Sequence, residues 1–265
     1  MDAIYPLFSS SKGNAVFIGN SSRGILIDCG VSFKKLDLAM KRCGLDVQAV
    51  KAVFITHEHS DHIKGLPVLT KKHSLSVYGQ AGTIRKLVRD NYINSNSEAL
   101  EIEISAELFD MKVTAFDTPH DAEHSCGYRV DFKDGTSCAV CTDLGCVTSA
   151  VDTAVLGADT VLLESNYDED MMMFSTYPRI LKQRICSERG HLSNHASAEQ
   201  ALKLVKNGTR NIILGHLSQE NNTPELAEKT VSERLSGYVR DRDYMLMVAK
   251  PETTGEKVVL KPCLT

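Results

Sequence analysis

The sequence has no long apolar run and no secretory leader pattern. None of its 265 residues belongs to a stretch approaching the roughly 20 apolar residues that a membrane-spanning helix needs. The first residues lack the basic start and the apolar core of a signal peptide. We therefore expect a protein without a membrane anchor that works in the cytoplasm.

A paired cysteine framework is also missing, although the chain has eight cysteines. Cys138 and Cys141 have C-x-x-C spacing, but they fall inside a predicted strand, where residues three apart point to opposite faces. Two such thiols are badly placed to bind one metal ion. We expect buried free thiols in a reducing compartment. The cysteines are Cys29, Cys43, Cys126, Cys138, Cys141, Cys146, Cys186 and Cys263.

An excess of positive charge is lacking as well, since the formal net charge is −4. A slightly acidic net charge does not indicate nucleic-acid binding, but it does not exclude a local basic groove either. Hydrophobic residues make up 42% and charged residues 24%, which is ordinary for a soluble globular protein. The length suits one large domain or two small ones.

The chain shows no internal repeat and no Pro/Gly/Ser-rich linker, and it alternates short predicted strands and helices. Two packed sheets with outer helices would satisfy this pattern, as would other α+β folds. The predicted strands cover 15–18, 24–28, 51–56, 75–78, 100–104, 111–116, 127–132, 136–142, 160–164 and 211–214, with two more between 244 and 260. The predicted helices cover 33–41, 63–71, 82–89, 177–187, a stretch after Ser197 with a Ser197/Gln200 capping box, and a helix from Thr223-Pro224.

The strongest chemical signal directly follows the predicted strand 51–56. His57, His59, Asp61 and His62 supply three imidazoles and a carboxylate within six residues, and these are usual ligands of zinc and similar ions. In an extended loop His57 and His59 point the same way and can bind one ion. Asp61 and His62, where the chain turns into a helix, can reach a second ion. A surface histidine cluster without function is the alternative interpretation.

Three further candidates each follow a predicted strand: His120, Asp143 and His216. Ligands at the ends of separate strands can converge on one edge of a sheet. Together with the first cluster they make seven ligands, which is the number that two adjacent metal ions need.

These residues, in this order, resemble the signature of the metallo-β-lactamase superfamily. Ser9–Asn14, Thr142–Gly145, Glu164–Asn166, Gly190–Asn194 and Leu214–Asn222 resemble more closely its YycJ/WalJ branch. One departure is Tyr167, where the branch usually carries histidine. The resemblance covers nearly the whole chain and implies a single domain over residues 1–265 with an α/β fold, the four-layer αββα sandwich.

The resemblance also implies roles for the ligands. His57, His59 and His120 would hold one ion, Asp61, His62 and His216 a second, and Asp143 would bridge them. Zinc suits the imidazoles and manganese suits the carboxylates. Branch members are described as DNA exonucleases, so the implied function is phosphodiester hydrolysis of DNA through a metal-bound hydroxide.

Further candidates lie around the predicted metal ligands. Asp61 and His191 are the predicted catalytic residues, with His191 meeting the leaving group or a phosphate. Glu164, at a strand end, would orient a ligating imidazole. A basic cluster before His191 would follow a phosphate backbone, although a solvated helix face is the ordinary interpretation. The predicted substrate contacts are Ser193, Asn194, Arg184 and Arg189.

Two other functions stay open at this point. An acyl hydrolase of thioesterase or lactonase type would use the same two ions, and a non-catalytic metal-binding module would need no substrate. The complete ligand set argues against the module, because structural zinc sites are usually closed by four ligands. The substrate would be held by loops of the core itself or across a homodimer.

Overall fold

The computed structural model describes residues 1–261, which divide into two compact units. Unit 1 consists of Met1–Ala106, Ala122–Cys126 and the chain from Lys250 onward. Unit 2 consists of Glu107–Asp121 and Gly127–Ala249. No helix among the described residues is both long and apolar enough to cross a membrane.

Unit 1 is built on a seven-stranded sheet with the strand order β14-β1-β2-β3-β4-β5-β6. Neighbours from β14 to β3 are antiparallel, and those from β3 to β6 are parallel. The strands are β1 (Ala3–Ser10), β2 (Gly13–Gly19), β3 (Gly24–Ile27), β4 (Val50–Ile55), β5 (Ser76–Gly79), β6 (Glu98–Glu101) and β14 (Val258–Val259). The helices are α1 (Phe33–Arg42), the 3-10 helix η1 (Val47–Ala49), α2 (Ser60–Ile63), α3 (Leu66–Lys72) and α4 (Ala81–Arg89).

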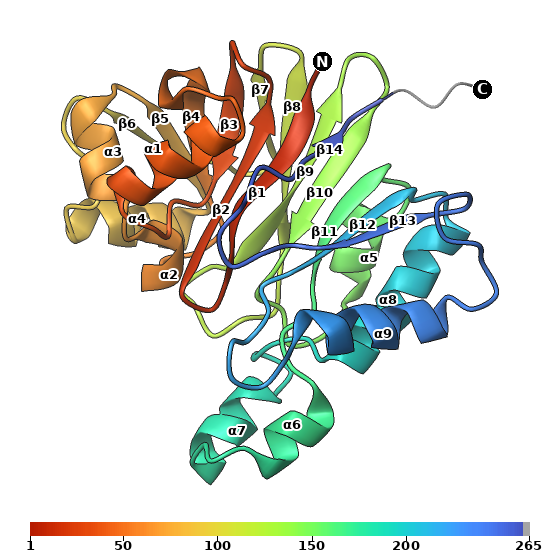
Figure 1. The fold of residues 1–265 in the computed structure, drawn as a ribbon. Helices are drawn as coiled ribbons and strands as arrows, with labels where there is room; N and C mark the ends of the chain where they lie inside the picture. The colour runs from red at the N-terminus through yellow and green to blue at the C-terminus, as the bar shows by residue number, and fades with distance from the viewer. Residues whose placement is uncertain (262–265) are drawn as a thin grey trace. The chain divides into compact units, whose positions relative to one another are not determined.

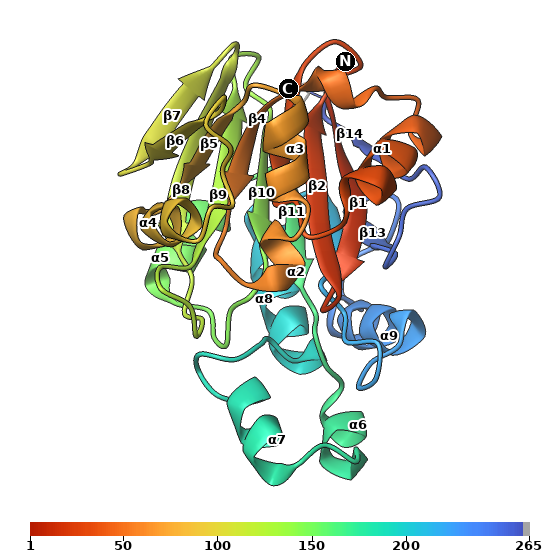
Figure 2. The ribbon, with the colours of Figure 1, turned by 90° about the vertical axis from the view of Figure 1, so that its left-hand side faces the viewer.

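The core of unit 1 lies between these helices and the sheet. Leu36 and Met40 of α1 and Leu69 of α3 pack in one cluster with Val53 and Ile55 of β4. Figure 2 shows α1 and α3 in front of this sheet. Strand β4 is a nearly continuous apolar run because the central parallel strands of such a sheet are buried on both faces. Because β4 is held in the core, its end at Ile55 fixes where the following residues, His57 to His62, begin.

Unit 2 contains a second seven-stranded sheet with the order β13-β12-β11-β10-β9-β8-β7, in which β10 to β13 are parallel. The strands are β7 (Ser105–Leu108), β8 (Met111–Asp117), β9 (Cys126–Phe132), β10 (Ser137–Cys141), β11 (Thr160–Glu164), β12 (Asn211–Gly215) and β13 (Met245–Val248). The helices are α5 (Ser149–Val155), α6 (Glu169–Phe174), α7 (Arg179–Ile185), α8 (Asn194–Lys206) and α9 (Pro224–Arg234). Figure 1 shows α8 and α9 side by side against this sheet.

Most predicted elements are confirmed, and β11 has the predicted bounds. The strands β1 and β7 and the helices η1, α2, α5 and α6 were not predicted, and the helix predicted over 63–71 is α3, which begins at Leu66. The capping box at Ser197 is wrong: α8 begins at Asn194, and Ser193 is its N-cap, with its Oγ accepting a hydrogen bond from Ala196 N–H. The first turn of α8 carries the polar residues Asn194 and His195, so apolar spacing could not reveal it.

The cysteines of the described chain are free, as predicted. Cys138 and Cys141 are buried, and burial raises the pKa of both thiols. Burial, with a smaller contribution from Asp28, also raises the pKa of Cys29 to about 12. The predicted burial is wrong for Cys186, which is exposed, and for Cys43 and Cys146, which are only partly buried; Cys263 lies outside the described residues.

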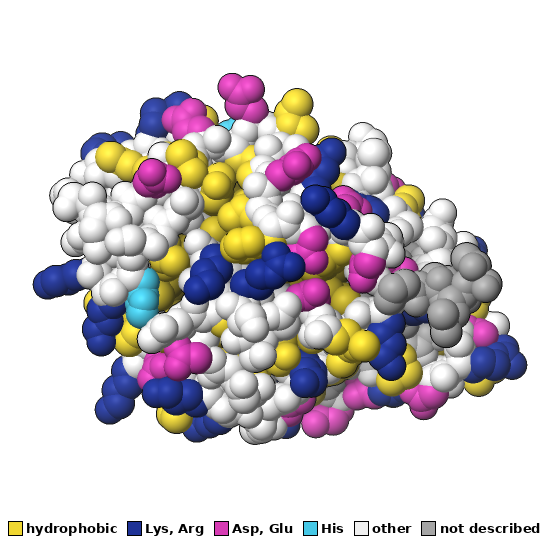
Figure 3. Space-filling view, turned by 90° about the horizontal axis from the view of Figure 1, so that it is seen from above, with side chains coloured by type: hydrophobic (Ala, Val, Ile, Leu, Met, Phe, Trp, Pro, Cys, Tyr) yellow, Lys and Arg dark blue, Asp and Glu magenta, His cyan; other side chains and the backbone are white. Residues whose placement is uncertain are grey.

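Charges of both signs are interleaved on the surface. On the face drawn in Figure 3, Lys and Arg side chains alternate with Asp and Glu side chains. This face therefore carries no broad basic groove.

Candidate active site

The histidine cluster of unit 1 lies where β4 ends and α2 begins. The rings of His57 and His59 are 4.6 Å apart between centroids, and those of His57 and His62 are 4.1 Å apart. Asp61 Oδ2 lies 3.3 Å from His62 Nε2. The structure therefore brings the four predicted ligands of this unit together.

A buried carboxylate orients two of these imidazoles. Asp28 Oδ2 accepts hydrogen bonds from His62 Nδ1 at 2.8 Å and from Thr56 Oγ1 at 2.9 Å. The Thr56 hydroxyl donates its one proton to Asp28, so it accepts the hydrogen bond from His57 Nδ1 at 3.1 Å. Both imidazoles thus carry their proton on Nδ1, which leaves Nε2 as a ligand atom.

Asp28 itself is held firmly although its backbone is strained. Its φ angle is +61°, in the left-handed region, and its Oδ1 accepts a hydrogen bond from Thr56 N–H at 2.9 Å. Burial raises the pKa of its carboxyl group, while the charge of His62 and the hydrogen bonds from His62 and Thr56 oppose this shift. The carboxylate is therefore a costly buried group kept in place by its partners.

Asn14 approaches the same cluster from the β1–β2 turn. Its Nδ2 lies 3.1 Å from His62 Nε2 and 3.3 Å from Asp61 Oδ2, and its Oδ1 accepts a hydrogen bond from Ser10 N–H. The side chain is nearly buried. The polar turn Ser9–Asn14 thus reaches predicted ligand atoms.

In unit 2, the predicted site residues follow the ends of neighbouring parallel strands. Asp143 follows β10, Glu164 ends β11, and His216 follows β12. The carboxyl ends of parallel strands lie at one edge of a sheet, so these side chains converge. Asp143 Oδ1 lies 3.6 Å from His216 Nε2 and 3.8 Å from His120 Nε2.

Glu164 is the buried support of this edge. Its Oε1 accepts hydrogen bonds from His191 Nδ1 and His216 Nδ1, both at 2.8 Å. Its Oε2 accepts the backbone N–H groups of Leu144 at 2.9 Å and Leu192 at 3.2 Å. Burial alone would raise the pKa of Glu164, but the charges and hydrogen bonds of His191 and His216 outweigh it and lower that pKa.

His120 is oriented by the main chain instead of a carboxylate. Its Nδ1 donates to Gly190 O at 3.0 Å, which leaves Nε2 facing the carboxylates of Asp121, at 3.3 Å, and Asp143, at 3.8 Å. Burial lowers the pKa of His120, opposed chiefly by the charge of Asp143. A lowered pKa keeps the imidazole neutral, as a metal ligand must be.

The donor set of unit 2 fits a divalent metal ion. Asp143, Glu164, His191 and His216 each offer one ligand atom, and these atoms all lie within 4.8 Å of one another. Because Glu164 already accepts four hydrogen bonds, it acts as the support, and Asp143 and His216 Nε2 are left as candidate ligand atoms. Imidazole and carboxylate together suit zinc, manganese and similar ions.

The predicted substrate contacts all have protein partners. Ser193 caps α8, and the buried Asn194 side chain bonds Ser165 Oγ at 2.7 Å and Asn222 at 2.9 Å, so Asn194 shapes the loop from within. Arg184 forms an ion pair with Asp121. The Arg189 guanidinium donates to His120 O at 3.0 and 3.3 Å.

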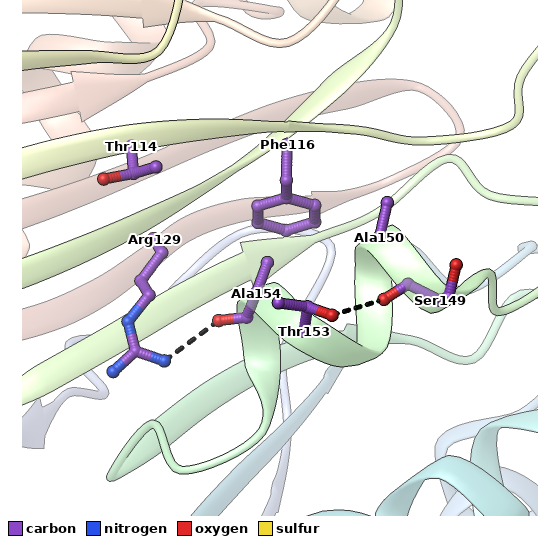
Figure 4. Close-up of a pocket in the computed structure, with 7 residues that line it drawn as sticks. All are labelled: Thr114, Phe116, Arg129, Ser149, Ala150, Thr153 and Ala154. Carbon is purple, nitrogen blue, oxygen red and sulfur yellow. Dashed lines mark hydrogen bonds between the residues drawn. The ribbon is translucent and has the colours of Figure 1, made fainter.

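A hollow beside α5 contains none of the predicted site residues. Figure 4 shows Phe116, Ala150 and Ala154 lining it, with Arg129 at one end. Arg129 Nη1 donates to the carbonyl oxygens of Ala154 and Leu156, at 2.9 and 3.3 Å, where α5 ends. Its charge thus stabilises a helix terminus, and we assign no ligand to the hollow.

Sequence reasoning missed two residues of the site, Asp28 and Asn14. Asp28 had the same signal as Asp143, an acid directly after an apolar strand. It lacked a neighbouring histidine in the sequence, since its partner His62 is 34 residues away. Asn14 lies in the Ser9–Asn14 motif that carries part of the resemblance, but nothing in the sequence singled out its side chain.

Comparison with known proteins identifies the family. Residues 23–217 match the family model described as the beta-lactamase superfamily domain. The chain belongs to the metallo-β-lactamase superfamily. It is 35% identical over 234 residues to "Exodeoxyribonuclease WalJ" of Streptococcus pneumoniae serotype 2 (strain D39 / NCTC 7466), covering 87% of each chain. It is 33% identical over 231 residues to "Exodeoxyribonuclease YycJ" of Bacillus anthracis, covering 86% of this chain and 87% of that one.

A solved structure gives the same fold. The metallo-beta-lactamase fold protein YhfI from Bacillus subtilis superposes with a TM-score of 0.70 at 15% identity, covering 95% of this chain and 98% of that one. The predicted α/β metallo-β-lactamase fold and the WalJ/YycJ branch are thus confirmed. The family and the two clusters also confirm a hydrolase with side chains suited to divalent metal ions.

Proposed function

We propose that this chain is an exodeoxyribonuclease that hydrolyses phosphodiester bonds of DNA with two divalent metal ions, zinc or manganese. The observation that carries the proposal is the orientation of the imidazoles: His57, His62, His120 and His216 each use Nδ1 in a hydrogen bond, which leaves Nε2 for a metal ion. The substrate follows from the two relatives named as exodeoxyribonucleases. Such a substrate suits the cytoplasmic location that the sequence predicts.

The proposed single domain over residues 1–265 would draw its metal ligands from both units. His57, His59 and His120 would hold one ion, and Asp61, His62 and His216 the other, with Asp143 between them. The match of the family model to residues 23–217, which include parts of both units, supports one domain. Two such ions would polarise a phosphoryl oxygen and acidify a water molecule.

The protein groups would position the substrate and move the proton. Asp61 is proposed as both ligand and catalytic residue. His191 is one-fifth exposed, and its Nδ1 proton is held by Glu164, so it would exchange a proton with the leaving oxygen at Nε2. Ser193, Arg184 and Arg189 are proposed near the substrate, and Asn194 as the buried support of their loop.

An assay on end-labelled single- and double-stranded DNA tests the proposal. Wild type would be supplied in turn with Mn²⁺ and Zn²⁺, beside His59→Ala and Asp61→Ala variants and an EDTA control. His73→Ala is the matched control, because His73 stacks on Phe33 away from the cluster. We expect stepwise loss of nucleotides by wild type and His73→Ala only. Equal degradation by every variant, or intact DNA with hydrolysis of a thioester, would overturn the proposal.

A further inference from the structure

The segment from Asp168 to Arg189, here called the α6–α7 arm, projects from unit 2. Figures 1 and 2 show α6 and α7 side by side, beyond α8 and away from the sheet of this unit. No side chain of α7 is fully buried. The arm therefore contributes little to the core of unit 2, and its outer surface needs another explanation.

That surface exposes unusually large apolar side chains. Phe174 and Ile180 are each 81% exposed, and Met173 is 65% exposed. Single exposed apolar residues are ordinary, but three on one short arm mark an interaction surface. An exposed phenylalanine ring, in particular, offers a flat face on which another ring can stack.

Helix α7 of the arm is cationic, whereas the first turn of α6 carries Glu169 and Asp170. Helix α7 carries Arg179, Lys182 and Arg184 and no acidic residue. Arg184 is paired with Asp121 and Lys182 Nζ donates to Met173 O, whereas the exposed Arg179 forms no ion pair within the described chain. An exposed aromatic ring and an unpaired guanidinium on the same short arm suit a polyanion with exposed flat bases, which is single-stranded nucleic acid.

The root of the arm is fastened to the candidate active site. Ile185 O accepts the His191 N–H at 2.8 Å, and the guanidinium of Arg189 binds His120 O. Gly190 is required at this junction because a Cβ there would lie 2.1 Å from Ile185 O. A strand held on the arm is thereby held by the element that carries His191.

We propose that the α6–α7 arm binds the single-stranded part of the DNA substrate. Bases stack on Phe174 and pack against Ile180, and Arg179 holds a phosphate; the inference rests on the proposed nuclease function. Double-stranded DNA offers no free base face, so the arm favours an unpaired end. The charge on α7 favours this occupant over a second copy of the chain.

The test compares an arm variant with a surface control in the metal-loaded protein. The arm variant combines Phe174→Ser, Ile180→Ser and Arg179→Glu. The control combines Ile104→Ser, which removes a side chain that is 71% exposed, with Lys229→Glu on α9. The readouts are the Kd of a fluorescent phosphorothioate 12-mer, which resists hydrolysis, and kcat/KM for bis(4-nitrophenyl) phosphate, which has a phosphodiester but no nucleobase.

We expect the Kd of the arm variant to rise about tenfold or more, since stacking of one base on an aromatic side chain alone contributes that much. The control and the small-substrate kcat/KM stay at wild-type values. An unchanged Kd, or wild type that binds no oligonucleotide, overturns the arm proposal whether or not DNA is cleaved. The arm proposal is also overturned if light scattering shows that the wild type is a dimer and the arm variant a monomer, while the Kd for the oligonucleotide is unchanged. Cleavage of unmodified DNA by wild type separately decides the nuclease function.

Discussion

Replacing Glu164 by glutamine removes the support of two predicted catalytic-site histidines while keeping the shape of the side chain. The carboxylate accepts four hydrogen bonds, two from imidazoles and two from backbone N–H groups. Glutamine has one acceptor oxygen and one NH₂ group. Its oxygen will face the N–H groups of Leu144 and Leu192, because these donors cannot change. Its NH₂ group then faces His191 and His216, each of which must move its proton to Nε2.

The expected loss follows from these contacts. Four hydrogen bonds pass from a charged to a neutral partner, each weakening by roughly 1 kcal/mol, and burying a neutral amide in place of a charge recovers part of this, so we expect about 2–4 kcal/mol less stability. A typical domain is stable by about 5–15 kcal/mol, so Glu164→Gln still folds. Metal affinity falls about 10–100-fold, because the Nε2 of His216 no longer carries a free lone pair.

Urea unfolding of the metal-free protein measures the stability change, and competition with a chromophoric chelator measures metal affinity. Glu233→Gln is the matched control, since Glu233 is 68% exposed and makes only a surface ion pair with Lys229 at 3.8 Å. We expect the control to stay within about 0.5 kcal/mol of wild type. If Glu164→Gln also stays within that margin and keeps its metal, the reasoning on tautomers is wrong.

The effect also has a defined pH dependence. The pKa of Glu164 is lowered in the folded protein, so its stabilising contribution is fully present above the pKa of an unfolded glutamate, about 4.3. The contribution is lost as pH falls from there through the folded pKa. The stability gap between wild type and Glu164→Gln should therefore be constant near neutral pH and narrow below about pH 5. If the stability difference between wild type and Glu164→Gln instead grows as pH falls, the expected direction of the pH dependence is wrong.

Three further substitutions test other parts of the site and fold. Asp28→Asn removes the acceptor that fixes the proton of His62 on Nδ1, and we expect metal affinity to fall about 10–100-fold in the chelator assay; wild-type affinity would contradict this. Asn14→Ala removes the amide beside Asp61 and His62. We expect metal affinity to fall about fivefold, which is the effect of one hydrogen bond. An unchanged metal affinity would mean that Asn14 only shapes its turn. Leu162→Ala opens a cavity in the fully buried centre of β11, and urea unfolding should show a loss of about 2–5 kcal/mol; a loss below about 1 kcal/mol would refute tight packing there.

The strands that lead to the site could be predicted because their cores are apolar and buried. Strands β4, β11 and β12 are such runs, and each was predicted to within one residue at each end. The strand β1 was not predicted, because Pro6 and two terminal serines interrupt its apolar pattern. The start of α8 was misplaced because a polar first turn has no apolar periodicity.

The ligands could be predicted because they are close in sequence or follow recognisable strands. Of their carboxylate supports, Glu164 was predicted from its place at a strand end, but its partners were not, and Asp28 was not predicted at all. Asp28 acts on His62 and Glu164 acts on His216, across 34 and 52 residues, and such pairs depend on the strand order within each sheet. A carboxylate at a strand end looks the same in the sequence whether it faces water or an imidazole.

The backbone explains why these particular residue types stand at the strand ends. Asp28, Asp143 and His216 all have φ between +55° and +61°, so the chain turns sharply as each strand ends. Asp and His tolerate this left-handed conformation better than β-branched or bulky residues do. Asp and His are also the residue types that bind metal ions or, in the case of Asp, accept a hydrogen bond from a ligating imidazole. Because one residue type meets both requirements, an Asp or His directly after a buried strand predicts a site more strongly than the residue type alone does.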